Sequence, residues 1–133
     1  PAGDEHRLQL ATAVLLVEVV RGDGGVDATE REALHGAIAA RFALAPQEAA
    51  ALVELAEHEA RQANDTYQFT SLINRSFSPQ QKLRVVELMW QVAYADATLS
   101  AHEQHVLRKV AELLHVPHGD YIAAKMRARD AAS

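Results

Sequence analysis

The chain has 133 residues, a formal net charge of −5 and no cysteine. This length suits a single domain over residues 1–133, and the lack of cysteine excludes disulfides, thiolate metal sites and cysteine nucleophiles. The acidic balance makes DNA and RNA unfavourable partners, because nucleic-acid-binding proteins carry a basic face. The apolar run at residues 13–17 is far too short to cross a bilayer, and no signal-peptide pattern opens the chain. We therefore expect a cytoplasmic protein with no direct membrane insertion.

Three helices are predicted in the first half of the chain from apolar spacing, caps and proline positions. The first extends over about residues 6–22, the second over 28–42 and the third over 46–64, with a proline at its first position. In the first helix, helical spacing places four apolar side chains on one face: Leu8, Ala11, Leu15 and Val19.

Four further helices are predicted in the second half. Asp65 is a good N-cap for a short fourth helix, and Ser78 followed by Pro79 starts the fifth. Ser100 caps the sixth, which Pro117 separates from a seventh. No alternation with a period of two residues persists long enough for a strand. The sequence therefore predicts an all-α fold, a compact bundle of about seven helices.

An internal repeat is the most informative feature of the sequence. At a constant offset, residues 19–30 align with residues 92–103, within units that we place at about 15–44 and 88–116. The aligned pairs include Asp23 with Asp96, Val26 with Leu99, Glu30 with Glu103 and, after a slip of one residue, Phe42 with Leu114 and Leu44 with Val116. We expect two pseudo-symmetric repeats, each a helix, an acidic turn and a second helix.

The glutamates of the two turns have a structural explanation. Asp27 with Glu30, and Ser100 with Glu103, each have the spacing of a capping box. In this motif the cap side chain accepts the N3 amide hydrogen bond, and the glutamate accepts one from the backbone of the cap residue. These two glutamates therefore need no further function to account for them.

Asp23 and Asp96 are not explained by folding alone. Each is expected in the last turn of a helix, where the dipole and free carbonyls already present negative charge, and an acid there costs a few tenths to about 1 kcal/mol. A bound cation would offset this repulsion. If the two turns meet about a pseudo-twofold axis, both aspartates converge with Glu30 and Glu103 on one site. Carboxylates are hard ligands that favour Ca²⁺, Mg²⁺ or Mn²⁺.

Other site chemistries fit the sequence less well. An EF-hand loop counted from Asp23 has Gly25 at position 3 and Leu34 at position 12, where acids are required. We expect the seven histidines to lie on the surface, with His102, beside Glu103, closest to a site. No nucleophile–base set stands out, so we expect no enzymatic activity.

Several segments, taken in their order and spacing, carry a family resemblance. Besides the doubled turn, they are Phe69-Thr70-x-Leu72-x-Asn74, Leu88-x-Trp90-x-Val92-Ala93-Tyr94-Ala95-Asp96 and Val116-Pro117. These motifs resemble the tellurite-resistance TerB-like family over about residues 8–127. The resemblance implies an all-α fold of two pseudo-symmetric repeats and a divalent-cation site formed by acids of both turns.

The ligands that the resemblance implies can be assigned position by position. The first turn supplies Asp23, Asp27 and Glu30, and the second supplies Asp96 and Glu103; the counterpart of Asp27 is a serine, Ser100. The second turn also departs from the family pattern, because Ala97 stands where Gly24 stands in the first. An alanine is strained in the left-handed backbone that glycine adopts readily.

Two functional hypotheses follow. The first is a non-enzymatic, divalent-cation-binding domain of the tellurite or stress-resistance type that acts through an unidentified protein partner. In the family that the sequence resembles, related domains occur fused to co-chaperones and membrane proteins. The second is a metal-independent interaction module whose acidic patch binds a basic partner segment. A metal-dependent hydrolase would need an open coordination position and a nearby pocket, and the sequence indicates neither.

Overall fold

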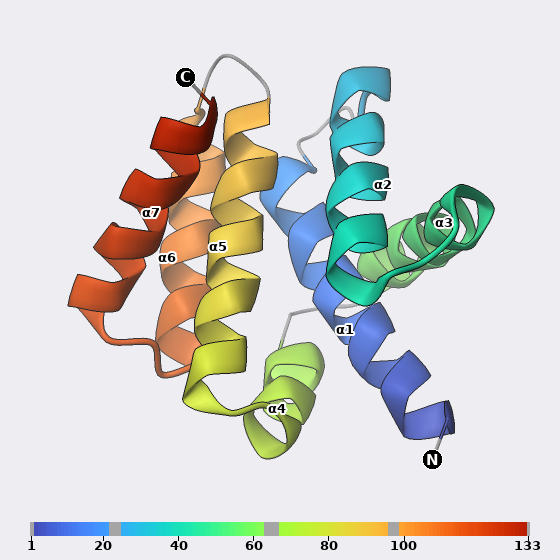
Figure 1. The fold of residues 1–133 in the computed structure, drawn as a ribbon, viewed down its shortest axis with the longest axis horizontal. Helices are drawn as coiled ribbons and strands as arrows, with labels where there is room; N and C mark the ends of the chain where they lie inside the picture. Colours follow the sequence, from blue (N-terminus) through green and yellow to red (C-terminus); the bar gives the residue numbers. More distant parts are fainter. Residues whose placement is uncertain (1, 22–24, 63–66, 96–98, 133) are drawn as a thin grey trace.

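The helices begin and end close to the caps and prolines of the sequence. The computed structural model describes residues 2–21, 25–62, 67–95 and 99–132, and within these ranges it contains helices and no strand. In chain order the helices are α1 (Ala2–Val20), α2 (Ala28–Phe42), α3 (Pro46–Gln62), α4 (Tyr67–Ser76), α5 (Pro79–Ala95), α6 (Ala101–Leu113) and α7 (His118–Ala132) (Figure 1). The predicted all-α bundle is confirmed, whereas Asp65, the predicted cap of the fourth helix, lies outside the described residues. No helix among those described is both long and apolar enough to cross a membrane.

The core forms around α1, which packs against α2, α3, α4, α5 and α6. Ala11, Leu15 and Val19 of the predicted apolar face are buried, and burial extends beyond that face to every residue from Ala11 to Val17. A helix that is apolar all round is a core helix, and this one has neighbours on several sides. The polar exception is Thr12, whose hydroxyl donates a hydrogen bond to the Leu8 carbonyl at 2.9 Å. That bond allows Thr12 to be buried without an unsatisfied group.

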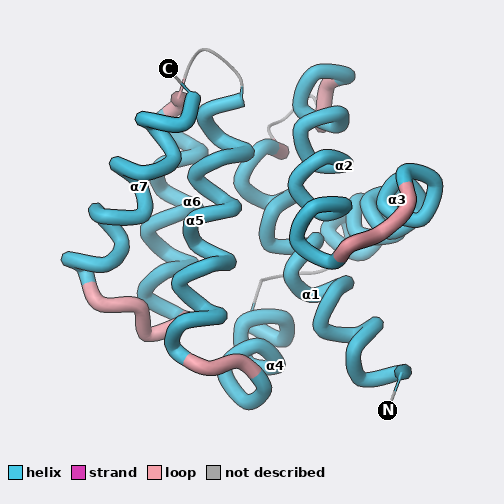
Figure 2. Tube along the Cα trace, viewed as in Figure 1, coloured by secondary structure: helices cyan, strands magenta, loops and turns pink. Residues whose placement is uncertain are grey.

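The remaining helices cover two sides of α1. α2 and α3 pack together on one side, and α5, α6 and α7 form the other (Figure 2). An aromatic cluster joins α7 to α5. Trp90 is 1% exposed and stacks on Tyr94, with 5.8 Å between ring centroids, and its ring lies 5.2 Å from that of Tyr121 on α7. The ammonium group of Lys125 lies 5.3 Å from the centre of the Trp90 ring.

Both predicted repeat units end in the same backbone motif. Ala43 after α2 and His115 after α6 have positive φ angles of 53° and 61°. The following amides, of Leu44 and Val116, each donate to the carbonyl five residues earlier at 3.0 Å. This is the hydrogen bond of a Schellman cap, which closes a helix by turning one residue into the left-handed region. The likeness of the units therefore extends to their last residues, while the symmetry between them stays a prediction.

Candidate functional site

The helix ends that flank the two predicted turns lie at the same end of the bundle. The ends of α1 and α5 and the beginnings of α2 and α6 all lie in the upper part of Figure 1. Asp23 and Asp96 lie outside the described residues. The other three predicted ligands, Asp27, Glu30 and Glu103, are described, and each lies at the beginning of a helix. A site shared by the two turns requires this arrangement of helix ends.

Asp27 and Glu30 form the predicted capping box at the start of α2. Asp27 Oδ1 accepts a hydrogen bond from the Glu30 N–H at 2.8 Å, and Glu30 Oε1 accepts one from the Asp27 N–H at 2.9 Å. Asp27 is exposed and Glu30 partly so. The structural explanation of this glutamate is confirmed, because its cap contact is made in full.

Arg31 fastens the first turn to α3, a contact that the sequence did not indicate. Its Nε and Nη2 donate to the two carboxylate oxygens of Glu57, both at 2.9 Å, and Nη2 also donates to the Val26 carbonyl at 3.1 Å. The hydrogen bond from Arg31 lowers the pKa of the Glu57 carboxyl below its ordinary value of 4.5. In the second unit the aligned residue is Gln104. Because Gln104 carries no charge, it cannot form an ion pair like that of Arg31 with Glu57.

We expect Glu57→Gln to lower the free energy of unfolding by about 1 kcal/mol at neutral pH, because Arg31 is 42% exposed and the pair is partly screened by solvent. Since folding lowers the pKa of Glu57, the stabilisation is complete above about pH 4.5 and disappears as the pH falls through the folded-state value. Urea unfolding at neutral pH and in acid measures both effects. Glu54→Gln, at an exposed position on the same helix, is the control. Equal losses in both variants, or a loss that persists in acid, would contradict the assignment.

Glu103 has the same place in the second capping box, yet it is buried. Its N–H donates to Ser100 Oγ at 3.0 Å, and its Oε1 accepts from the Ser100 N–H at 2.9 Å. The residue is only 5% exposed, and among the described residues its buried Oε2 has no hydrogen-bond partner. An unpaired carboxylate oxygen inside a protein is costly, so such groups are rare. The cap accounts for Oε1 and leaves Oε2 unexplained.

The unpaired oxygen of Glu103 has the chemistry of a ligand for a hard cation. Within the described parts of the chain, no three His, Cys, Asp or Glu side chains gather as a metal site. The predicted ligand set depends on Asp23 and Asp96, which the described ranges do not include. The histidines lie on the surface as predicted, with His35 half-buried and the others exposed. His102, the neighbour of Glu103, is among the exposed ones.

A family model described as "Tellurite resistance protein TerB" matches residues 9–126. No curated protein and no solved structure matches the chain significantly. The matched range spans both acidic turns and the positions of all five predicted ligands.

Proposed function

Because this chain belongs to the TerB family of tellurite resistance proteins, we propose that it binds a divalent cation between its two acidic turns and serves a partner protein rather than a substrate. Its family makes it a helical domain of the tellurite-resistance type. The proposed ligands come from both turns: Asp23, Asp27, Glu30, Asp96 and Glu103. Their carboxylates are hard oxygen donors, so the cation is Ca²⁺, Mg²⁺ or Mn²⁺.

The buried Oε2 of Glu103 is the observation that carries this proposal. A glutamate that served only as a helix cap could leave its second oxygen in water, as surface caps do. Here that oxygen is buried with no donor from the described part of the chain, at the end of the bundle where the helices flanking both turns lie. A cation would compensate its charge, and would also offset the repulsion between aspartates and helix carbonyls in the two turns.

The capping boxes also limit how the glutamates would bind. Glu30 Oε1 and Glu103 Oε1 each accept a backbone N–H of the cap residue. If the caps persist, Glu103 would offer the cation Oε2 alone. Most of the oxygen atoms free to bind the cation would then come from the aspartates, two in the first turn and one in the second, where the counterpart of Asp27 is Ser100.

Metal titration tests the proposal directly. We expect chelator-treated protein to bind Ca²⁺, Mg²⁺ or Mn²⁺ in calorimetry, and its free energy of unfolding to rise by about 2.7 kcal/mol at a concentration 100-fold above the dissociation constant. The double variant Asp23→Asn with Asp96→Asn should lose this response. Glu103→Gln should weaken it, because the amide that replaces the carboxylate is neutral.

Glu112→Gln is the matched control, since Glu112 is an exposed acid on the same helix as Glu103. The absence of heat and of stabilisation at millimolar metal would overturn the proposal. So would a stabilisation that survives the double aspartate variant. In either case the acidic turns would be left as an electrostatic patch for a basic segment, which predicts salt-sensitive capture that is indifferent to chelator.

A further inference from the structure

A groove runs between α1 and α4, away from the acidic turns. It consists of two adjoining hollows of about 280 and 440 Å³ that share Arg7, Leu72 and Arg75 as lining residues. Its floor is apolar and consists of four half-buried side chains: Leu8, Leu10, Phe69 and Leu72. The core helix α1 thus leaves apolar side chains near its beginning only partly covered.

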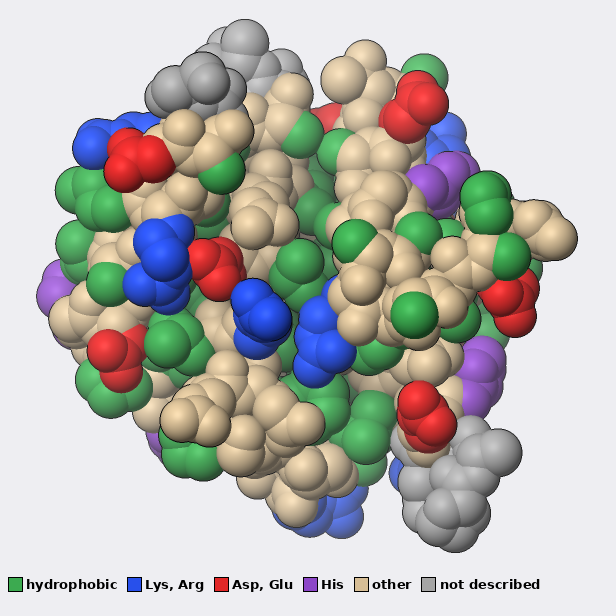
Figure 3. Space-filling view, in the orientation of Figure 1, with side chains coloured by type: hydrophobic (Ala, Val, Ile, Leu, Met, Phe, Trp, Pro, Cys, Tyr) green, Lys and Arg blue, Asp and Glu red, His purple; other side chains and the backbone are tan. Residues whose placement is uncertain are grey.

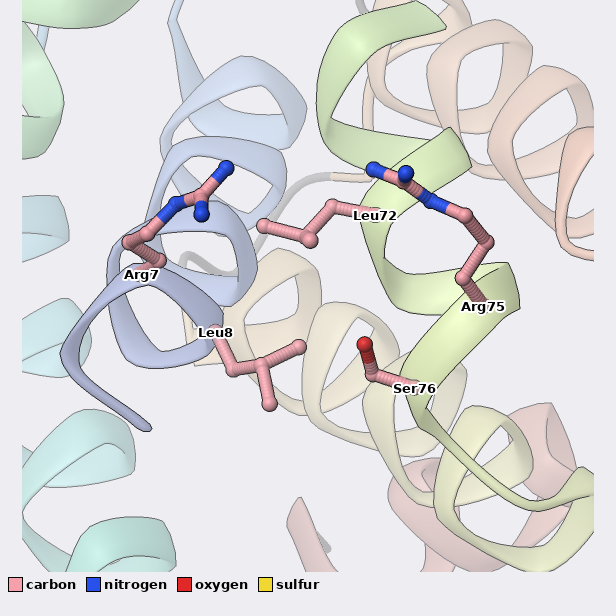
Figure 4. A pocket seen from close by; sticks show the side chains of 5 residues that line it. All are labelled: Arg7, Leu8, Leu72, Arg75 and Ser76. Carbon is pink, nitrogen blue, oxygen red and sulfur yellow. The ribbon is translucent and has the colours of Figure 1, made fainter. Parts of the chain in front are cut away.

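Two arginines flank this floor. In Figure 4 the side chains of Arg7 from α1 and Arg75 from α4 approach from opposite sides, and Leu72 lies between their guanidinium groups. Leu8 and Ser76 lie below them in the same view. A ligand seated on Leu72 would therefore meet a guanidinium on either side. Guanidinium groups bind carboxylates through two parallel hydrogen bonds, which gives both affinity and orientation.

The described lining of the groove carries two arginine side chains, in a chain whose net charge is −5. Neither hollow has an aspartate or glutamate among its described lining residues. Arg7 is already engaged in another interaction, so Arg75 is the group available for a ligand. Arg75 is exposed, and within the described structure it forms no hydrogen bond or ion pair. A carboxylate on the occupant is its natural complement.

The composition of the groove is that of a protein interface. Tyr67 lies along it and is 67% exposed, the highest exposure among the large hydrophobic side chains of the described residues. Tyrosine, phenylalanine and arginine are enriched where proteins bind one another, whereas lysine and glutamate are depleted. The described lining of the groove follows this pattern, with Tyr67, Phe69 and two arginines and with no lysine or glutamate.

We propose that this groove binds an acidic, amphipathic segment of a partner protein. Aliphatic side chains of the segment would cover the leucines and Phe69, and one of its carboxylates would pair with Arg75. A free anion would gain nothing from the apolar floor, and a flat bilayer would not reach side chains at the bottom of a hollow. The floor runs beside α4, whose 10 residues extend about 15 Å, close to three turns of a bound helix.

The groove is separate from the proposed cation site. α4 and the beginning of α1 lie in the lower part of Figure 1, whereas the helix ends beside the acidic turns lie in the upper part. The inference therefore goes beyond the proposed function and does not depend on metal. Binding in the groove should be the same with and without chelator, so that failure of either proposal can be recognised without the other.

Selection from a peptide library tests the groove. Phage-displayed random peptides of about 15 residues, which span about 22 Å as helices, are selected in parallel on the wild type and on Arg75→Gln. We expect the peptides enriched only on the wild type to combine Asp or Glu with Leu, Ile or Phe. A synthetic copy of the most enriched peptide should bind Arg75→Gln about tenfold more weakly in fluorescence anisotropy. Leu72→Asn should weaken it similarly by disrupting the floor.

Arg84→Gln is the matched control. Arg84 is an exposed arginine that lines a different hollow, between α2 and α5, where Glu87 lies beside it and pairs with Arg127 at 2.7 Å. On the face of the molecule shown in Figure 3, basic side chains lie among acidic ones. This variant should bind the peptide like the wild type.

Several results would overturn the proposal. They are the absence of peptides specific to the wild type, the enrichment of basic peptides, and equal losses in Arg75→Gln and Arg84→Gln. Binding to vesicles containing phosphatidylserine that Arg75→Gln abolishes, without any peptide binding, would also overturn it in favour of a lipid. Because Arg75 is exposed, its variant should unfold like the wild type, and this keeps the test valid if Leu72→Asn disturbs α4.

Discussion

Truncation of Leu16 to alanine is expected to lower the free energy of unfolding by about 3 kcal/mol. Leu16 is fully buried in the helix that packs against α2 to α6. Because neighbours hold α1 on several sides, the space left by the side chain would close only in part, and the cavity would add its cost to the lost burial. The loss is large against a total stability of about 5–15 kcal/mol. Urea unfolding followed by circular dichroism measures it.

Leu55→Ala is the control for this prediction, since Leu55 on α3 is 38% exposed. We expect it to change stability by no more than about 0.5 kcal/mol. A loss at Leu16 as small as that at Leu55 would mean that α1 is not the centre of the core.

The second large effect is expected at Trp90. Trp90→Ala should cost about 3–5 kcal/mol, because it removes the ring that joins α5 to α7. The ring is buried against Tyr94 and Tyr121, and the Lys125 ammonium group lies above it. Chemical unfolding again gives the magnitude, and the exposed Met126→Ala on α7 serves as the control for loss of an apolar side chain from that helix.

Trp90→Phe separates ring packing from the indole N–H. The buried Trp90 Nε1 has no hydrogen-bond partner among the described residues, so phenylalanine removes an unpaired donor while it keeps an aromatic ring. We expect a loss of about 1 kcal/mol, well below that of alanine. If phenylalanine were as damaging as alanine, packing of a ring between α5 and α7 would not be the source of the stability.

The helices could be predicted because their ends are specified locally. Pro46 and Pro79 each begin a helix, Pro117 precedes one, and the capping boxes of Asp27 and Ser100 form as their spacing indicates. A capping box requires only two residues that are three positions apart, so it can be predicted from the sequence alone. How much of α1 is buried could not be predicted from local sequence, because burial depends on which helices surround it.

Contacts between segments that are far apart in the chain could not be predicted from the sequence. Arg31 pairs with Glu57 across 26 positions, and nothing in either segment indicates the other as its partner. The groove likewise needs the start of α1 and the face of α4 to meet, although Arg7 and Arg75 are far apart in the chain. Such contacts follow from how helices pack, and packing is set by the whole core rather than by a motif.

The candidate site was predictable only in part. Glu30 and Glu103 have the same spacing from their caps, and the sequence explains both equally well. The structure distinguishes them, because packing buries Glu103 and the described residues offer its Oε2 no hydrogen-bond donor. Asp23 and Asp96 remain predictions that rest on the helix dipole and on the family, since both lie outside the described residues.

The aromatic cluster gives the protein an optical signal of its own. The chain has a single tryptophan, so all indole emission comes from Trp90 on α5. A buried indole emits at shorter wavelength than one in water, and the rings of Tyr94 and Tyr121 are close enough to transfer excitation energy to it. Separation of α7 would expose the indole and shift its emission to the red. Trp90 lies one turn before Tyr94 near the end of α5, the helix that leads into the second acidic turn.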